Sequence, residues 1–524
     1  MGAGLILRLG FVLIARPGLP VSGDTGFYFW QANFAIHGRP FISPTDLLFF
    51  HRLTPGSDHP PLTTFIEAVA DFYGLTSFLS HQIIWCLLGT VTVGLIGTCG
   101  RDLAGDRAGL LAGMLAAVYP GFWINDGLVE SETIAQLLVA LLLFQAYRFW
   151  KQPSKSRALV IGVVTGLVIM ARSEDLLLCG FLMVPLFIGA HEQLPGVRRG
   201  PLLSPRAWNL SARPSISPDL RSRLRNAWKS ATTWGSDRDN APAARRLQGK
   251  KRVIFATIGF GGAILVVLPW TIHNLTTFQK TEFISTQLGR TLLGSNCYDT
   301  YYGSQLGYWS YGCELTEPAP TGDQSVSDTF YRHEAITYAL HHKSRWIPVI
   351  YARLGRTFGF YDPVGNLQID ALLQRPYWAS VWQLIMYYAL LPSAIGGFMM
   401  LKRRHIAVFP LLAPVAGTFL TVAVTYGTTR FRATCEPTLV LLAALGELGW
   451  SRRIAGSDRA RTGHPGGFGG IALRLVQSLV GIPDPEDAKE SADPDALDVD
   501  RQLNNQQYEP EISVSTASGL QTGV

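Results

Sequence analysis

Long apolar runs, separated by short polar segments, limit most strongly what this chain can fold into. The runs at 78–100, 253–270 and 381–401 contain no Asp, Glu, Lys or Arg. Such segments are typical of membrane-spanning helices, because about 20 apolar residues cross the hydrocarbon core of a bilayer. Only 16% of the chain is charged, whereas soluble domains have roughly a quarter. The sequence therefore predicts an all-α polytopic membrane protein.

About ten transmembrane helices can be counted, although short spans and interfacial helices have similar hydropathy. The expected spans are 5–15, 78–100, 108–119, 133–149, 158–171, 176–190, 253–270, 381–401, 406–424 and 439–450. The first span carries Arg8, which we expect either to extend towards the membrane surface or to face the protein interior.

Composition divides the chain into four parts. Residues 1–190 are expected to form an N-terminal membrane module with a catalytic first outer loop. Residues 191–252 are rich in Arg, Ser and Pro without an apolar period, so we expect a disordered basic cytoplasmic loop. Residues 253–450 are expected to form a C-terminal membrane module with an outer loop at 271–378. The remainder, 451–524, is predicted to be a disordered cytoplasmic tail.

Positive charge is unevenly distributed among the predicted loops. Lys and Arg are concentrated at 151–157, 191–252, 402–404 and 452–453. Alternate threading of the ten spans places these segments on one side, which the positive-inside rule assigns to the cytoplasm. The net charge of +7 therefore reports topology, and no nucleic-acid partner is expected. We expect a multi-pass protein of the cell inner (plasma) membrane, with its active site on the extracytoplasmic face.

Acidic residues and arginines recur near the outer ends of the expected spans. Carboxylates such as Asp24 and Glu132 can act as a general base or hold a divalent cation. Arg172, Arg430 and Arg432 can bind a phosphate through paired hydrogen bonds. Together these groups suit a lipid-linked phosphosugar: the base takes a proton from an acceptor hydroxyl, and the arginines stabilise the departing lipid phosphate.

In their order and spacing these residues resemble the GT-C class of membrane glycosyltransferases. Within that class, the likeness is to protein O-mannosyltransferases, lipid A aminoarabinose transferases and RgtABCD-like enzymes. Asp24 followed by Tyr28 is similar to the first outer loop of the family, whose acidic residue is taken as catalytic. The other similar elements are His59-Pro60-Pro61-Leu62, Ser131-Glu132-Thr133, Arg172, Leu268-Pro269-Trp270 with Asn274, and Arg430-Phe431-Arg432 with Glu436-Pro437.

The resemblance implies a glycosyltransferase that moves a hexose or pentose from a polyprenyl-phosphate donor. The acceptor would be a lipid, polysaccharide or protein outside the membrane. Asp24 would be the general base and Glu132 a second acid. The residues expected to bind substrate are Tyr28, His59, Arg172, Arg430 and Arg432.

Two departures from the family pattern bear on cofactors and charge. Many members have Asp-Glu in the first loop, where this chain has Asp24-Thr25. A metal held by that pair is therefore less expected, and no metal ligand is assigned, although a divalent cation remains an option. An arginine of the family is replaced by His273, which is charged only when protonated.

Other functions and roles stay open at this stage. The second function is a transporter or flippase of a lipid-linked or anionic substrate, which often has repeated halves and mid-membrane sites. A non-catalytic scaffold is a third. Asp24 could serve in a turn or helix cap, Glu132 could favour a helix N-terminus, and Arg172 could anchor at the interface.

Two cysteines lie in one polar segment on the expected outer side. Cys297 and Cys313 would enclose a loop of about 15 residues, and bridging them would contribute about 3 kcal/mol. We expect this disulfide because the outer side is oxidising. Cys435 lies near the same face and could compete for either partner.

Overall fold

The computed structural model describes residues 1–16, 23–189, 191–193, 244–246, 249–317, 320–404 and 406–462, with backbone only at 191–193, 244–246 and 450–462. Two compact units are present, Met1–Gly449 and Trp450–Val524. The modules expected at 1–190 and 253–450 lie within the first unit. All contacts described below belong to that unit.

Helices make up nearly all of the regular structure. In chain order they are α1 (Gly2–Gly10), η1 (Phe11–Ala15), α2 (Gly23–Ile36), α3 (Pro44–Phe50), α4 (Leu62–Phe72), α5 (Phe78–Ala104), α6 (Asp106–Val118), α7 (Pro120–Trp123), η2 (Asn125–Gly127), α8 (Ser131–Lys151), α9 (Lys155–Ala171), η3 (Ser173–Leu176), η4 (Cys179–Met183), α10 (Val184–Ile188), α12 (Gly249–Thr277), α13 (Leu288–Ser295), α14 (Tyr298–Tyr301), α15 (Tyr311–Thr316), α16 (Gln324–His341), η6 (Lys343–Arg345), α17 (Trp346–Thr357), α18 (Pro363–Leu372), α19 (Tyr377–Arg403), α20 (Phe409–Val424), η7 (Thr429–Cys435) and α21 (Glu436–Thr462).

Four helices in the described chain are long and apolar enough to cross a membrane: α5, α8, α12 and α19. A fifth candidate joins α6 to the segment Pro120–Gly127 through a bend of 61°. The segments Gly2–Ala15 and Phe409–Val424 are shorter apolar helices. The all-α membrane fold is thus confirmed, whereas the count of about ten spans is not.

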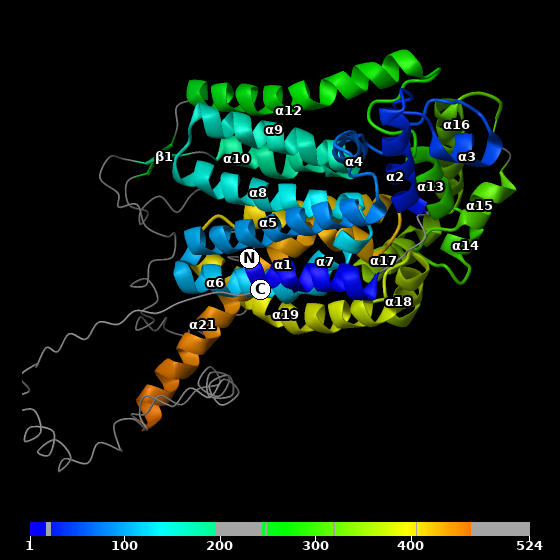
Figure 1. Ribbon diagram of the computed structural model, residues 1–524. Helices are drawn as coiled ribbons and strands as arrows, with labels where there is room; N and C mark the ends of the chain where they lie inside the picture. The colour runs from blue at the N-terminus through cyan, green and yellow to red at the C-terminus, as the bar shows by residue number, and fades with distance from the viewer. Residues whose placement is uncertain are drawn as a thin grey trace, which may run out of the picture. The chain divides into compact units, whose positions relative to one another are not determined.

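The long helices pack side by side, and the short ones gather beyond one end of them (Figure 1). The α9–α12 contact is especially close, because a Cβ built on Gly162 would lie only 1.9 Å from the carbonyl oxygen of Gly259. Small residues allow membrane helices to approach in this way. Any larger side chain at Gly162 would therefore separate the two helices.

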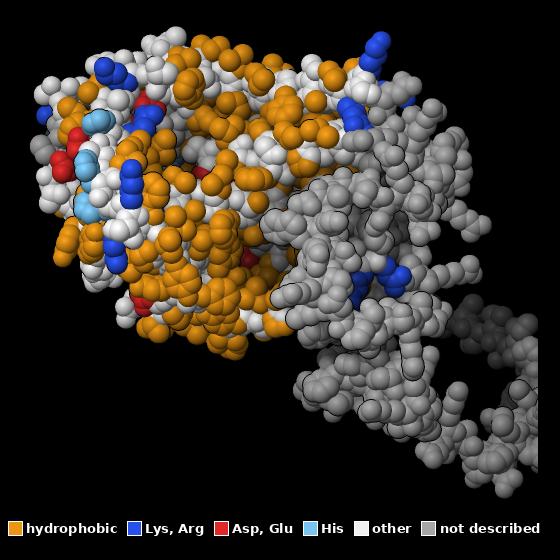
Figure 2. Space-filling view, turned by 180° about the vertical axis from the view of Figure 1, so that it is seen from behind, with side chains coloured by type: hydrophobic (Ala, Val, Ile, Leu, Met, Phe, Trp, Pro, Cys, Tyr) orange, Lys and Arg blue, Asp and Glu red, His pale blue; other side chains and the backbone are white. Residues whose placement is uncertain are grey.

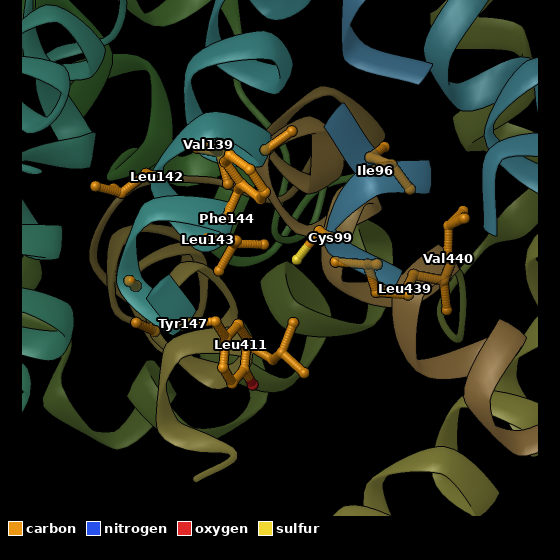
Figure 3. Packing of buried hydrophobic residues seen from close by; sticks show 14 of the residues in the cluster. Ile96, Cys99, Val139, Leu142, Leu143, Phe144, Tyr147, Leu411, Leu439 and Val440 are labelled. Atoms are coloured by element: carbon orange, nitrogen blue, oxygen red, sulfur yellow. The ribbon is translucent and has the colours of Figure 1, made fainter. Parts of the chain in front are cut away.

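A large apolar core joins the long helices, and Figure 3 shows a part of it. Val139 and Leu143 of α8 pack there with Ile96 of α5 and Leu411 of α20. Apolar side chains also cover much of the outer face seen in Figure 2, with histidines and charged groups towards one end. Apolar residues both inside and outside are what a bilayer requires, since lipid rather than water surrounds the helices.

Arg8 faces the protein interior, which settles the two options left open by the sequence. Its Nε lies 2.8 Å from Oδ2 of Asp126, and both side chains are fully buried. The apolar helix α1 thus tolerates a cation because η2 supplies the opposite charge. A buried charge without such a partner would be strongly destabilising.

Two segments expected to be loops are largely helical. The first outer segment forms α2 and α3, and Ser43 caps α3 by accepting a hydrogen bond from the amide of Asp46 at 3.3 Å. The expected outer loop 271–378 contains the end of α12 and then α13 to α18. Short amphipathic helices lack the long apolar runs that reveal spans. The helical spacing of Ile347, Ile350, Leu354 and Phe358 predicts an interfacial helix at 345–360, where α17 lies, but the other short helices were not predicted.

The basic segment 191–252 contains short ordered pieces at its two ends. Strand β1 (His191–Gln193) pairs antiparallel with β2 (Ala244–Arg246), and α12 already begins at Gly249. The rest of this segment, and the tail beyond Thr462, lies outside the described residues, so the expected disorder there is not tested. In the tail, α21 continues to Thr462.

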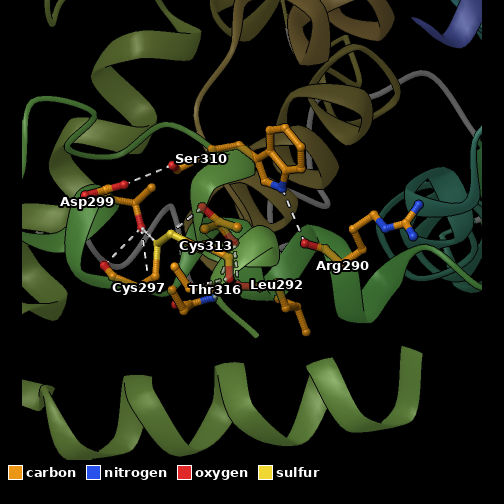
Figure 4. Close-up of a disulfide and its surroundings, with 12 residues drawn as sticks. Arg290, Leu292, Cys297, Asp299, Ser310, Cys313 and Thr316 are labelled. Atoms are coloured by element: carbon orange, nitrogen blue, oxygen red, sulfur yellow. Dashed lines mark hydrogen bonds between the residues drawn. A yellow bond between two sulfur atoms is a disulfide. The ribbon is translucent and has the colours of Figure 1, made fainter. Parts of the chain in front are cut away.

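The predicted Cys297–Cys313 disulfide is present (Figure 4). It ties the start of α14 to α15, and Asp299 and Ser310 form a hydrogen bond of 3.1 Å beside it. Cys435 is not a competitor, because it is buried and donates a hydrogen bond to the Thr418 hydroxyl.

Candidate active site

The site is built at the N-terminal end of α8, where Glu132 occupies the first turn. Its side chain is fully buried, and a carboxylate in this position is favoured by the helix dipole. Oε1 of Glu132 lies 2.9 Å from Nε of Arg430 and 2.8 Å from Nη1 of Arg172. Glu132 therefore joins two arginines that the sequence places far from it and from each other.

Asp24 lies in the first turn of α2 and reaches the same arginine. Its Oδ2 accepts a hydrogen bond of 2.8 Å from Nη2 of Arg430, and its Oδ1 lies 3.5 Å from Nε2 of His59. The Asp24 side chain is 30% exposed, whereas those of Glu132 and Arg430 are 0% and 16% exposed. Asp24 is thus the carboxylate of this cluster most open to an incoming molecule.

Arg430, in η7, is the centre of the cluster. Besides Asp24 and Glu132, its Nη2 lies 3.5 Å from Oε2 of Glu130. The three carboxylates raise the pKa of Arg430 well above its ordinary value, although burial alone would lower it. Arg430 therefore stays charged, and it offsets repulsion among acids drawn from α2 and from the start of α8.

Glu130 also belongs to this cluster; the sequence reasoning counted it among the outer acids with less weight than Glu132 and assigned it no role. It precedes α8, and its Oε1 accepts a hydrogen bond of 3.3 Å from the Thr25 hydroxyl. Burial, aided by the charges of Glu132 and Asp24, raises the pKa of Glu130 to about 7 in spite of Arg430. The signal that could have found it is the spacing Glu-x-Glu, two acids on either side of a helix start.

The charge state of Asp24 is set by its neighbours. Burial would raise its pKa, but Arg430 and His59 lower the pKa below the usual range for an aspartate. Conversely, burial would lower the pKa of His59, and the Asp24 carboxylate raises it instead. At neutral pH Asp24 is therefore ionised, and protonated His59 is favoured beside it.

Aromatic rings line the Asp24 side of the cluster. The rings of Tyr28 and Phe27 both lie 4.9 Å from the His59 imidazole, centroid to centroid. Tyr28 is buried, and burial together with the Asp24 and Glu132 charges raises its pKa well above the ordinary value. Tyr28 thus keeps its hydroxyl proton and can donate it in a hydrogen bond.

Arg172, at the end of α9, is held on both sides. Its Nη1 meets Glu132, and its Nη2 lies 2.6 Å from Oε1 of Glu174. Its guanidinium also lies 5.7 Å from the centroid of the Phe431 ring. The structure therefore brings Arg172 into the site, but with its charge already paired.

Arg432 is the predicted site residue that the structure places apart from the others. Its Nε donates a hydrogen bond of 2.8 Å to Glu436, and its guanidinium stacks 3.9 Å from the centroid of the Tyr387 ring. It lines a small cavity of about 10 Å³ together with Asp370 and Gln383. Its contacts are with α19 and α21, so it has none with Asp24 or Glu132.

Within the described chain, no group of three or more His, Cys, Asp or Glu side chains is arranged to hold a metal ion. The acids at the site are instead separated by Arg430. The arrangement offers an exposed carboxylate for proton transfer, a protonatable imidazole beside it, and fixed positive charges behind both.

One segment of the chain is similar to a known protein family. Residues 58–194 match the family model described as dolichyl-phosphate-mannose-protein mannosyltransferase. No curated protein matches the chain. This segment includes His59, Glu130, Glu132 and Arg172 but not Asp24 or Arg430.

Two solved structures are similar at low identity. One is the oligosaccharyltransferase AglB from Archaeoglobus fulgidus in complex with an inhibitory peptide and a dolichol-phosphate, at 14% identity, a TM-score of 0.47, and coverage of 99% of this chain and 61% of that chain. The other is ArnT from Cupriavidus metallidurans bound to undecaprenyl phosphate, at 12% identity, a TM-score of 0.32, and coverage of 88% and 78%. The chain thus spans about three fifths of the oligosaccharyltransferase. The family match agrees with the resemblance drawn from the sequence: at residues 58–194 the chain is similar to the dolichyl-phosphate-mannose-protein mannosyltransferase family.

Proposed function

We propose that this protein is an integral-membrane glycosyltransferase that moves a sugar from a polyprenyl-phosphate donor to an acceptor outside the cytoplasm. The observation that carries the proposal is the pairing of exposed Asp24 with Arg430 beside Glu132. The match of residues 58–194 to a mannosyltransferase family supports the same reaction class.

In this reaction Asp24 is the general base. The ionised carboxylate takes the proton of an acceptor hydroxyl as that oxygen bonds to the anomeric carbon of the sugar. The bond from the anomeric carbon to the phosphate oxygen breaks, and the prenyl phosphate leaves with the electron pair. Asp24 is a weak base while Arg430 holds it, so we propose that substrate binding loosens that ion pair and makes Asp24 more basic.

Glu132 and His59 have supporting roles in the proposal. Glu132 holds Arg430 and Arg172 in place through oxygen–nitrogen distances of 2.9 and 2.8 Å. His59, protonated beside the base, favours the ionised form of Asp24. After transfer Asp24 releases the acceptor proton to solvent, because its side chain is 30% exposed. Tyr28 packs on His59 and limits its orientation.

The extracytoplasmic location is part of the proposal. The acid–arginine cluster lies at the N-terminal end of α8, whereas Arg148 and Lys151 contact Asp102 at its C-terminal end. A 21-residue helix separates those ends by about 30 Å, the thickness of the hydrocarbon core. The basic end suits the cytoplasm. Clustering at one end also favours an enzyme over a transporter, whose site would lie near mid-membrane.

A deletion strain tests the proposed function and identifies the sugar. Mass spectrometry would compare cell-envelope glycans and polyprenyl-phosphate sugars in the deletion strain and in the strain complemented with the wild-type chain. We expect one sugar to be missing from an envelope glycan and its polyprenyl-phosphate form to accumulate. Unchanged glycans with no accumulated donor would contradict the proposal.

A further inference from the structure

The three arginines predicted from the sequence to bind phosphate are poorly placed to do so, because each already forms an ion pair with a carboxylate. Arg430 contacts three acids, Arg172 contacts Glu132 and Glu174, and Arg432 contacts Glu436. An incoming phosphate would have to break these ion pairs. A guanidinium without an acidic partner would bind it more readily.

Two buried arginines near the same acids lack such a partner among the described residues. Arg16 follows η1 and is 7% exposed, and Arg375 lies between α18 and α19 and is 3% exposed. Nε and Nη2 of Arg16 and Nε of Arg375 are buried without a hydrogen-bond acceptor. Buried N–H groups normally have acceptors, so these three atoms indicate that a ligand supplies them.

The two side chains converge on the turn η2. Nη2 of Arg375 donates a hydrogen bond of 2.9 Å to Oδ1 of Asn125. The Arg16 stem passes over Gly127, where an added Cβ would lie 3.4 Å from Cγ of Arg16 and 3.7 Å from its Nε. These distances place the Arg16 side chain in van der Waals range of η2.

Arg16 and Arg375 repel each other electrostatically, and both are attracted to Glu130 of the catalytic cluster. Burial and the Arg375 charge together lower the pKa of Arg16 to about 10, although the Glu130 charge opposes the change. The charges of Arg430 and Arg375 in turn act to lower the pKa of Glu130. Two desolvated cations near one another repel; the Asp370 and Glu130 charges offset this in part, and a bound phosphate would offset it further.

The lack of a carboxylate partner does not by itself identify an arginine as ligand-binding, as Arg353 shows. It is also buried and forms no ion pair in the described chain, but its guanidinium donates to the carbonyl oxygens of Ser295, Ala423 and Val424 and to Asn296. Those acceptors account for both of its Nη groups, and only its Nε is buried without one. Arg16 has no comparable set of acceptors among the described residues.

We propose that Arg16 and Arg375 form the phosphate-binding site of this protein, with the phosphate of a prenyl-phosphate lipid as its ligand. The proposal rests on the proposed function, because the donor chemistry supplies the lipid phosphate. It assigns the positive charge that holds the leaving phosphate to these two residues instead of Arg172, Arg430 and Arg432.

Binding measurements on the purified full-length chain test this site without requiring sugar transfer. Undecaprenyl phosphate and inorganic phosphate would be titrated separately against wild type, Arg16→Gln, Arg375→Gln and the double variant. We expect each single change to weaken lipid binding about tenfold and the double change roughly a hundredfold, as loss of a charge-assisted contact implies. Arg39→Gln is the matched control, because Arg39 is exposed, and its binding should equal wild type.

A second readout separates binding from folding. Arg16→Lys keeps the charge and should retain part of the affinity. Without ligand, Arg16→Gln should unfold at or above the wild-type temperature, because it removes repulsion from Arg375. The thermal shift caused by undecaprenyl phosphate should nevertheless be lost.

The outcomes distinguish this inference from the proposed function. Inorganic phosphate binding that depends on both arginines, without lipid binding, would support the anion site and contradict the lipid donor. Lipid binding that is equally tight in wild type and in the folded double variant would overturn the Arg16–Arg375 site and leave the donor intact.

Discussion

Arg430 Nη2 lies 2.8 Å from Oδ2 of Asp24, although the two residues are 406 positions apart in the sequence. This contact joins the first outer segment of the chain to η7, directly before the last helix. Glu132 completes it from the start of α8. A site with a base, a cation and a second acid therefore depends on three distant parts of the chain.

Replacing Arg430 should destabilise the fold as well as the site. Arg430→Gln leaves three carboxylates without their shared cation, and we expect a loss of about 3–5 kcal/mol in the free energy of unfolding. Arg430→Lys should lower the free energy of unfolding by less, because lysine keeps the positive charge but cannot make the hydrogen bonds to Asp24 and Glu132 together. Denaturant unfolding in detergent measures the difference. Equal stability of Arg430→Gln and wild type would show that the ion pairs are not needed for folding.

The Arg8–Asp126 pair gives a test of the buried charge in α1. Arg8→Met alone should destabilise by about 3–5 kcal/mol, because Asp126 is left buried without its cation. Adding Asp126→Leu should recover much of the loss, since both charges are then gone. A double-mutant cycle measures this coupling. Additive losses would mean that the two side chains do not interact.

The disulfide is tested by counting thiols. Wild-type protein denatured without reductant should show four reactive thiols, from Cys86, Cys99, Cys179 and Cys435, and six after reduction. Six thiols in both conditions would rule the bridge out. Cys297→Ser should lower stability by about 3 kcal/mol, as expected for a loop of this size.

Glu130 should make donor binding depend on pH. Its pKa is raised to about 7, so it is mostly neutral below pH 7 and becomes negatively charged above. Between pH 6 and 8 we expect affinity for the anionic donor to fall, by roughly tenfold for one nearby charge. His59 contributes in the same direction, because its raised pKa means that it loses positive charge as pH rises.

Two variants separate these contributions. Glu130→Gln should remove the part of the pH dependence centred near pH 7, and Glu130→Gln with His59→Gln should remove the rest. The phosphodiester of the donor does not titrate in this range. A pH profile that is identical in Glu130→Gln and wild type would show that Glu130 does not titrate near the bound donor.

Much of the site could be predicted from sequence, because charged residues at span ends are informative in a membrane protein. Asp24, Glu132, Arg172 and Arg430 were expected on one face, and the structure brings these four together. Arg432 could not be separated from Arg430 by pattern alone. On a 3-10 helix, residues two apart point in directions about 120° apart, so the second arginine turns towards Glu436.

The remaining features depend on contacts that no local pattern contains. Hydropathy cannot show that Asp126 neutralises Arg8, or that Arg172 and Arg430 are already paired. Hydropathy also missed α2, α13 to α16 and α18, where apolar residues are too few for a span, whereas helical spacing predicted α17. Glu130 was given less weight because burial, which raises its pKa, is a property of the fold.

The most direct test of the central claim is sugar transfer by Asp24→Asn in proteoliposomes. Release of prenyl phosphate from its sugar-linked donor would be measured for wild type, Asp24→Asn and the control Asp106→Asn, which changes an exposed acid of α6. With wild-type folding and donor binding retained, Asp24→Asn should be slower by about 10²- to 10⁴-fold, the usual contribution of a general base, and Asp106→Asn should be unchanged. Transfer by folded Asp24→Asn at the wild-type rate would contradict the account.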